Sequence, residues 1–136
     1  MAENGGNEVG IDRAFERLPA DLRPQLGKVW SDAEWAELSH RERRRLSAWI
    51  VHLIGSDAAD ALEAGSFDRR TDGHASRTVS VVDEQGWREL ARIQEDALEA
   101  VLRIKAASAE RLAESGEDGV LALSAMLCFE LPPRSS

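Results

Sequence analysis

Apolar side chains recur every three or four residues in two long stretches of the chain, which is the spacing of one face of an α-helix. The first stretch covers 40–64. Ser39 and Glu42 form a capping-box pair at its start, and Gly65 supplies a left-handed stop at its end. The same Ser-x-x-Glu pattern opens a shorter helix over 31–38. The pattern therefore predicts two successive helices.

The second stretch predicts a helix over 84–114, capped by Asp83 and free of proline. A helix of this length spans about 47 Å at 1.5 Å per residue, which is too long for one small core to cover. We therefore expect part of its inner face to need a further partner. That face comprises Trp87, Leu90, Ala91, Gln94, Ala97, Leu98, Val101, Ile104, Lys105, Ser108 and Leu112.

Two further segments have the composition of β-strands. Residues 77–82 are rich in β-branched side chains that partly alternate with polar ones, and 120–130 carry large apolar side chains on both faces. The predicted fold class is therefore α+β and mostly helical, with the long helix between the two strands. Two strands alone are marginal in water, so we expect them to need cover as well.

Length and composition favour one folded domain over 29–133. Residues 1–28 read as a flexible tail with a short helix over 11–18, and 134–136 as a second tail. No stretch approaches the roughly 18 apolar residues that a membrane helix needs. A single cysteine, Cys128, excludes an internal disulfide and favours the reducing cytoplasm, where we expect it to be a small core residue.

A two-fold dimer would bury the long helix and the strand edges together. We therefore predict a homodimer without a membrane partner. The alternative is a monomer in which helix 40–64 packs across the sheet. The expected interface residues are Leu90, Leu98, Val101, Ile104, Leu112, Leu127 and Phe129.

The formal charge is −8, because 25 acidic residues outnumber 17 basic ones. Proteins that bind DNA draw most of their affinity from Lys and Arg, so we expect no direct nucleic-acid binding from this chain alone. The basic cluster in 40–46 is typical of a solvated helix face, and a contact with an acidic partner or a phosphate backbone is the alternative.

A polar run, 67–78, joins the first long helix to the first predicted strand. Arginine forks bind carboxylate or phosphate, and histidine changes charge near neutral pH, so this run is a candidate ligand site. The alternatives are a structured turn for the polar residues and core packing for the tryptophans. The candidate ligand-binding residues are Arg69, Asp72, His74 and Arg77, with Trp49 and Trp87 as aromatic walls.

No pattern predicts catalysis or metal binding. His40, His52 and His74 are scattered over separate elements, and a metal sensor needs clustered ligands. The sequence lacks a Gly-x-Ser-x-Gly motif, a phosphate loop and a dinucleotide fingerprint. We therefore expect neither an enzyme, a cofactor nor a metal site, and we expect His52 to be a hydrogen-bonded core or interface histidine.

Three runs resemble the C-terminal domain of actinobacterial ArsR-like winged-helix transcriptional regulators. They are Phe-Asp-Arg…Asp-x-His-x-Ser-Arg-Thr (67–78), Asp-Glu-Gln-Gly-Trp (83–87) and Ser-Ala-Glu-Arg-Leu-Ala…Ser-Gly-Glu (108–117). The resemblance covers about 29–133 and implies a dimerisation or effector domain without enzymatic activity.

In that family a winged-helix domain of roughly 70 residues precedes this region and reads DNA. Only 28 residues precede the matching segment here, and they show no helix-turn-helix pattern. The expectation is thus a chain without its own DNA-reading domain, which could also pair with a full-length related regulator. The alternative function is a small-molecule sensor that binds its ligand near 67–78 and the tryptophans.

Overall fold

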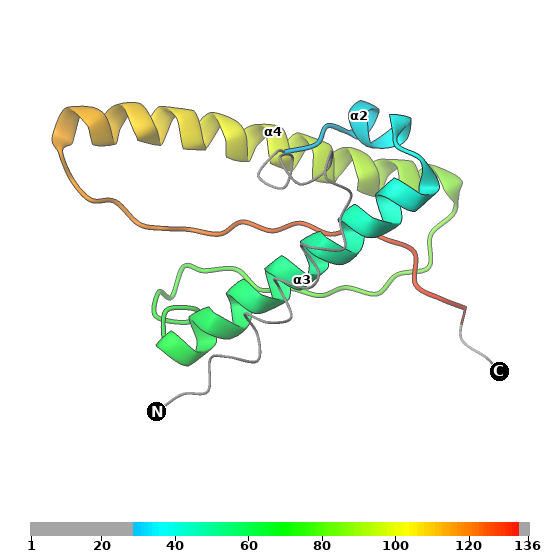
Figure 1. Ribbon diagram of the computed structural model, residues 1–136, viewed down its shortest axis with the longest axis horizontal. Helices are drawn as coiled ribbons and strands as arrows, with labels where there is room; N and C mark the ends of the chain where they lie inside the picture. Colours follow the sequence, from blue (N-terminus) through cyan, green and yellow to red (C-terminus); the bar gives the residue numbers. More distant parts are fainter. Residues whose placement is uncertain (1–28, 134–136) are drawn as a thin grey trace. The chain divides into compact units, whose positions relative to one another are not determined.

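The computed structural model describes residues 29–133, in which the chain forms three helices (Figure 1). These helices are α2 (Asp32–Glu37), α3 (His40–Ala64) and α4 (Glu84–Ser115). The chain divides into two compact units between Arg77 and Thr78. The first unit contains α2 and α3 with the turn that follows, and the second contains α4 and the segments on either side of it.

Capping hydrogen bonds fix the starts of α2 and α3. The Ser31 hydroxyl accepts a hydrogen bond from the Glu34 amide at 3.2 Å. At the start of α3 the capping box is complete: the Ser39 hydroxyl accepts from the Glu42 amide, and the Glu42 carboxylate accepts from the Ser39 amide, both at 3.1 Å. These bonds satisfy amides that have no partner within a helix. The predicted break between the two helices is confirmed.

The left-handed cap predicted for α3 is also present. Gly65 has a φ of 77°, and its amide donates to the carbonyl oxygens of Ala61 and Leu62. Glycine reaches this region of backbone space without the steric penalty of a Cβ atom. Leu46 and Trp49, which both lie within α3, are the buried residues within 29–133.

The long helix α4 begins and ends at equally well-marked caps. The Asp83 carboxylate accepts a hydrogen bond from the Gly86 amide at 2.8 Å, and Gly116 closes the helix with a φ of 72°. After this cap the chain turns and runs back in the opposite direction (Figure 1). No residue of α4 is buried. The predicted span is confirmed to within one residue. That its inner face needs a further partner stays a prediction.

The predicted α+β class is wrong. Within 29–133 neither 77–82 nor 120–130 forms a strand, and both run as irregular chain on either side of α4. A β-rich composition becomes a strand only when a neighbouring strand accepts and donates its backbone hydrogen bonds. The two segments do not pair with each other here, and most of their apolar residues are exposed; Val81 and Leu121 are fully exposed.

The predicted tails, 1–28 and 134–136, and the predicted helix over 11–18 lie outside the described residues.

Candidate functional site

The polar joint folds into an exposed turn that makes its own local contacts. Arg70 donates two parallel hydrogen bonds to Asp72, from Nε to Oδ1 at 2.9 Å and from Nη2 to Oδ2 at 3.0 Å. His74 Nε2 lies 2.8 Å from the Ser76 hydroxyl. All four side chains are exposed, so water competes for each of these contacts.

The Arg70–Asp72 pair changes the acidity of both groups. The hydrogen bonds from Arg70 lower the pKa of the Asp72 carboxyl, and its positive charge adds to this effect. Reciprocally, the hydrogen bonds to Asp72 raise the pKa of the Arg70 guanidinium. Each charge thus already has its partner within the turn, and a ligand carboxylate would have to compete with Asp72 for Arg70.

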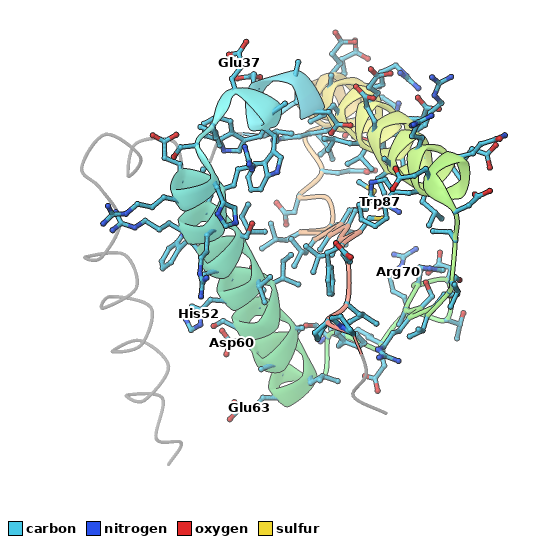
Figure 2. All side chains as sticks on the ribbon, turned by 90° about the vertical axis from the view of Figure 1, so that its right-hand side faces the viewer. Glu37, His52, Asp60, Glu63, Arg70 and Trp87 are labelled. Atoms are coloured by element: carbon cyan, nitrogen blue, oxygen red, sulfur yellow. The ribbon has the colours of Figure 1, made fainter. Side chains whose placement is uncertain are left out.

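The predicted ligand-binding residues belong to both units. Arg69, Asp72, His74 and Arg77 lie in the turn of the first unit, and all four are exposed. Trp49 lies on α3 in the same unit and is 5% exposed. Trp87 lies in the first turns of α4, in the second unit (Figure 2).

The sequence did not indicate which arginine of this turn pairs with Asp72. Arg70, and not Arg69, holds Asp72. Both arginines precede the aspartate closely, and the turn geometry alone decides which of them meets it. The spacing gave no signal that could separate them.

A second grouping lies on α3, where Trp49 stacks on His52 with ring centroids 6.2 Å apart. His52 is half-buried, and within 29–133 its Nε2 atom has no hydrogen-bond partner. The hydrogen bond expected for His52 is therefore not found among the described residues. The stacking places an aromatic face against the imidazole, which is a packing contact.

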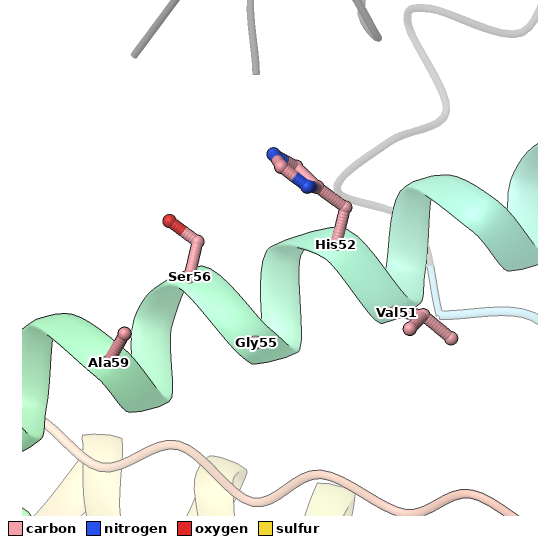
Figure 3. Close-up of a pocket in the computed structure, with 5 residues that line it drawn as sticks. All are labelled: Val51, His52, Gly55, Ser56 and Ala59. Atoms are coloured by element: carbon pink, nitrogen blue, oxygen red, sulfur yellow. The ribbon is translucent and has the colours of Figure 1, made fainter. Parts of the chain in front are cut away.

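Next to His52 lies an open depression of about 360 Å³ along α3. Among the described residues its lining comes from one helix, and neither Trp49 nor Trp87 contributes to it. Figure 3 shows His52 and Ser56 projecting from the same side of the helix, and Gly55 also lines the depression. A ligand pocket usually buries most of its ligand between several elements. This depression is too open to be one.

The predicted interface residues of α4 differ in how far they are exposed within the single chain. Of the predicted interface residues in the helix, Leu90, Leu98, Val101 and Leu112 are half-buried, whereas Ile104 is 63% exposed. The returning segment 120–131 carries further exposed apolar side chains. Among them are the predicted interface residues Leu127 and Phe129.

One prediction about a single side chain can be compared with the structure. Cys128 is exposed, so its predicted place in a core is wrong. Within 29–133 no three His, Cys, Asp or Glu side chains are grouped so that they could hold a metal ion. None of the described helices is both long and apolar enough to cross a membrane.

No known protein family, curated protein or solved structure matches this chain.

Proposed function

We propose that this chain is a non-enzymatic dimerisation or effector domain of a winged-helix transcriptional regulator, and that it acts as a homodimer. One observation carries the proposal: the 32-residue helix α4 presents a mainly apolar stripe from Trp87 to Leu112, yet it contains no buried residue. A helix with such a stripe is stable when a second apolar surface covers it.

The stripe has the composition that association requires. Full burial of a Leu or Val side chain contributes about 1.5–3 kcal/mol, whereas two chains lose about 4–15 kcal/mol of translational and rotational freedom when they associate. Several half-buried side chains are thus needed from each copy. Leu90, Leu98, Val101 and Leu112 supply them, and a two-fold dimer uses each of them twice.

The family resemblance supports the same region. The run 83–87 forms the cap and first turn of α4, and the run 108–117 forms its last turns and the glycine cap. The third run, 67–78, is the turn that holds the Arg70–Asp72 pair. Two of the three runs thus fix where the long helix begins and ends, which determines the length of the stripe.

The proposal is tested by measuring the mass in solution by light scattering over a concentration series. We expect a dimer that dissociates on dilution. The variant Leu98→Asp places a charge in the half-buried stripe and is expected to weaken the dimer at least about tenfold, because burying an unpaired charge costs several kcal/mol. Ile93→Asp is the matched control, since Ile93 lies on the same helix and is 60% exposed.

A chain that stays monomeric at every concentration contradicts the proposal. Equal weakening by Leu98→Asp and Ile93→Asp contradicts the part played by the stripe. Circular dichroism of both variants shows whether α4 remains helical.

A further inference from the structure

The spacing of the stripe on α4 indicates whether a second copy of the helix would pack against it in a parallel or an antiparallel direction. Starting at Trp87, eight stripe positions follow one another at alternating intervals of four and three residues and end at Leu112. This is the heptad spacing of a left-handed coiled coil. The inference that follows rests on the proposed function, because it specifies how two copies of the helix would pair.

The eight positions are symmetric about the middle of the helix. The helix Glu84–Ser115 has its midpoint between Glu99 and Ala100, and the stripe from Trp87 to Leu112 has the same midpoint. When two identical helices run in opposite directions about a two-fold axis at this point, each position lies level with its mirror position on the partner. All eight positions then find a counterpart, and no part of the stripe overhangs.

The mirrored positions match in chemistry at the centre. Leu98 lies level with the partner's Val101, so two apolar side chains meet on each side of the axis. Gln94 lies level with the partner's Lys105, and an amide oxygen can accept a hydrogen bond from the ammonium group. The two long polar side chains of the stripe, Gln94 and Lys105, therefore face each other and not an apolar residue.

The outer positions match in size. Ala91 lies level with the partner's Ser108, which pairs two small residues, and both are half-buried. Trp87 lies level with the partner's Leu112, which pairs two large apolar residues at the ends of the stripe. Such agreement at every level is what a self-complementary interface requires.

The distribution of charged side chains along α4 also favours an antiparallel pair. The first half of α4, 84–99, carries five acidic and two basic side chains, and the second half, 100–115, carries three basic and two acidic ones. Antiparallel helices set the acidic half of one copy beside the basic half of the other. Parallel helices would set the acidic halves together and Lys105 beside the partner's Lys105, and a charge at one such position is known to select against an arrangement.

We propose that α4 pairs with α4 of a second copy as an antiparallel two-stranded coiled coil centred between Glu99 and Ala100. Gln94 and Lys105 set its register.

Disulfide crosslinking between two different variants tests the direction. On a Cys128→Ser background, a tagged Ala91→Cys chain is mixed with an untagged Ser108→Cys chain and oxidised. The mixture should give at least about tenfold more linked dimer than either variant alone, because a disulfide needs Cα atoms about 4.4–6.8 Å apart. In a homodimer of either variant the two cysteines would lie about 25 Å apart along the helix.

The matched control uses Asp96→Cys mixed with Arg103→Cys. These positions mirror each other about the same midpoint, but they lie on the opposite face of the helix and are exposed. We expect no linkage above background.

A spin label provides a second measurement that leaves the stripe intact. Glu114 is exposed near the end of α4. Labels on Glu114→Cys chains, again with Cys128→Ser, should lie about 44 Å apart along the axis of an antiparallel dimer at 1.5 Å per residue, and side by side in a parallel one.

Each outcome decides between the two proposals. Linkage within the Ala91→Cys variant alone, or a short label distance, means a parallel pair and overturns the antiparallel inference. A dimeric mass without linkage in the mixture also overturns it, because another surface then makes the dimer, and the proposed function survives. A monomeric mass overturns both.

Discussion

At the scale of single residues, contacts between near neighbours in a helix were predictable and contacts within the turn were not. Ser39 and Glu42 meet because a helix start places the third residue over the cap, whatever the rest of the fold does. Arg70 and Asp72 meet only because 66–77 adopts one particular turn. The predicted ligand set accordingly named Arg69, which the turn leaves out of the pair.

The Arg70–Asp72 pair leads to a prediction about pH. Arg70 lowers the pKa of Asp72, so the pair is present above the ordinary pKa of an aspartate and is lost as the pH falls through the lowered value. In Arg70→Gln we expect the pKa of Asp72 to rise back toward its ordinary value. Carboxyl-carbon NMR titration measures this.

Arg69→Gln is the control for the pH prediction, because Arg69 stands next to Arg70 in the same turn. It should leave the Asp72 titration nearly unchanged. An Asp72 pKa that responds equally to both substitutions would mean that the general positive charge of the turn, and not the paired geometry, sets the value.

At the scale of elements, helices were predicted well and strands were not. A helix satisfies its backbone hydrogen bonds within its own segment, so caps and apolar period suffice to locate α3 and α4. A strand depends on a distant segment for every one of those bonds. Residues 77–82 and 120–130 have strand composition, but within the described chain they find no such segment.

Two glycines of the α3 region lead to opposite predicted effects. Gly55 lies within α3, and Gly65 caps it at a φ of 77°. Within 29–133 a Cβ atom at either position meets no atom within 4 Å beyond its chain neighbours and the backbone of the helix. Gly55→Ala should stabilise the protein by about 0.5–1 kcal/mol, because glycine loses more backbone entropy in a helix. Gly65→Ala should cost about 1 kcal/mol, because an L-residue is strained in the left-handed region.

Urea unfolding followed by circular dichroism measures the free energy of unfolding of both glycine variants. Because neither substitution creates a clash, each serves as the other's control for side-chain volume. Equal signs for the two changes would contradict the assigned backbone conformations.

At the scale of the whole molecule, the question is which surface covers the apolar side chains that the two units leave exposed. The described residues include two buried side chains, Leu46 and Trp49, and both belong to the first unit. The second unit has a long amphipathic helix and exposed apolar side chains in 120–131. An apolar face of this extent usually marks an interaction surface, and this is why a second copy is the proposed partner.

The overall charge leads to a prediction about nucleic acid. With a net charge of −8, the chain should show no binding to duplex DNA up to about 100 μM at physiological salt, the upper range of non-specific affinities. Fluorescence anisotropy of a labelled duplex measures this. Binding that weakens steeply with added salt would contradict the prediction, and its loss in the triple variant Arg43→Ala, Arg44→Ala, Arg45→Ala would assign it to the basic start of α3.

The sequence by itself determined the three helices, their caps and the face of α4 that carries the apolar stripe, because each of these depends on residues within a few positions of one another. It also determined the symmetry of that stripe. Only the tertiary structure decided that 77–82 and 120–130 form no sheet, that Cys128 is exposed and that Arg70 takes Asp72. Those outcomes depend on which distant groups meet, and local composition does not specify that.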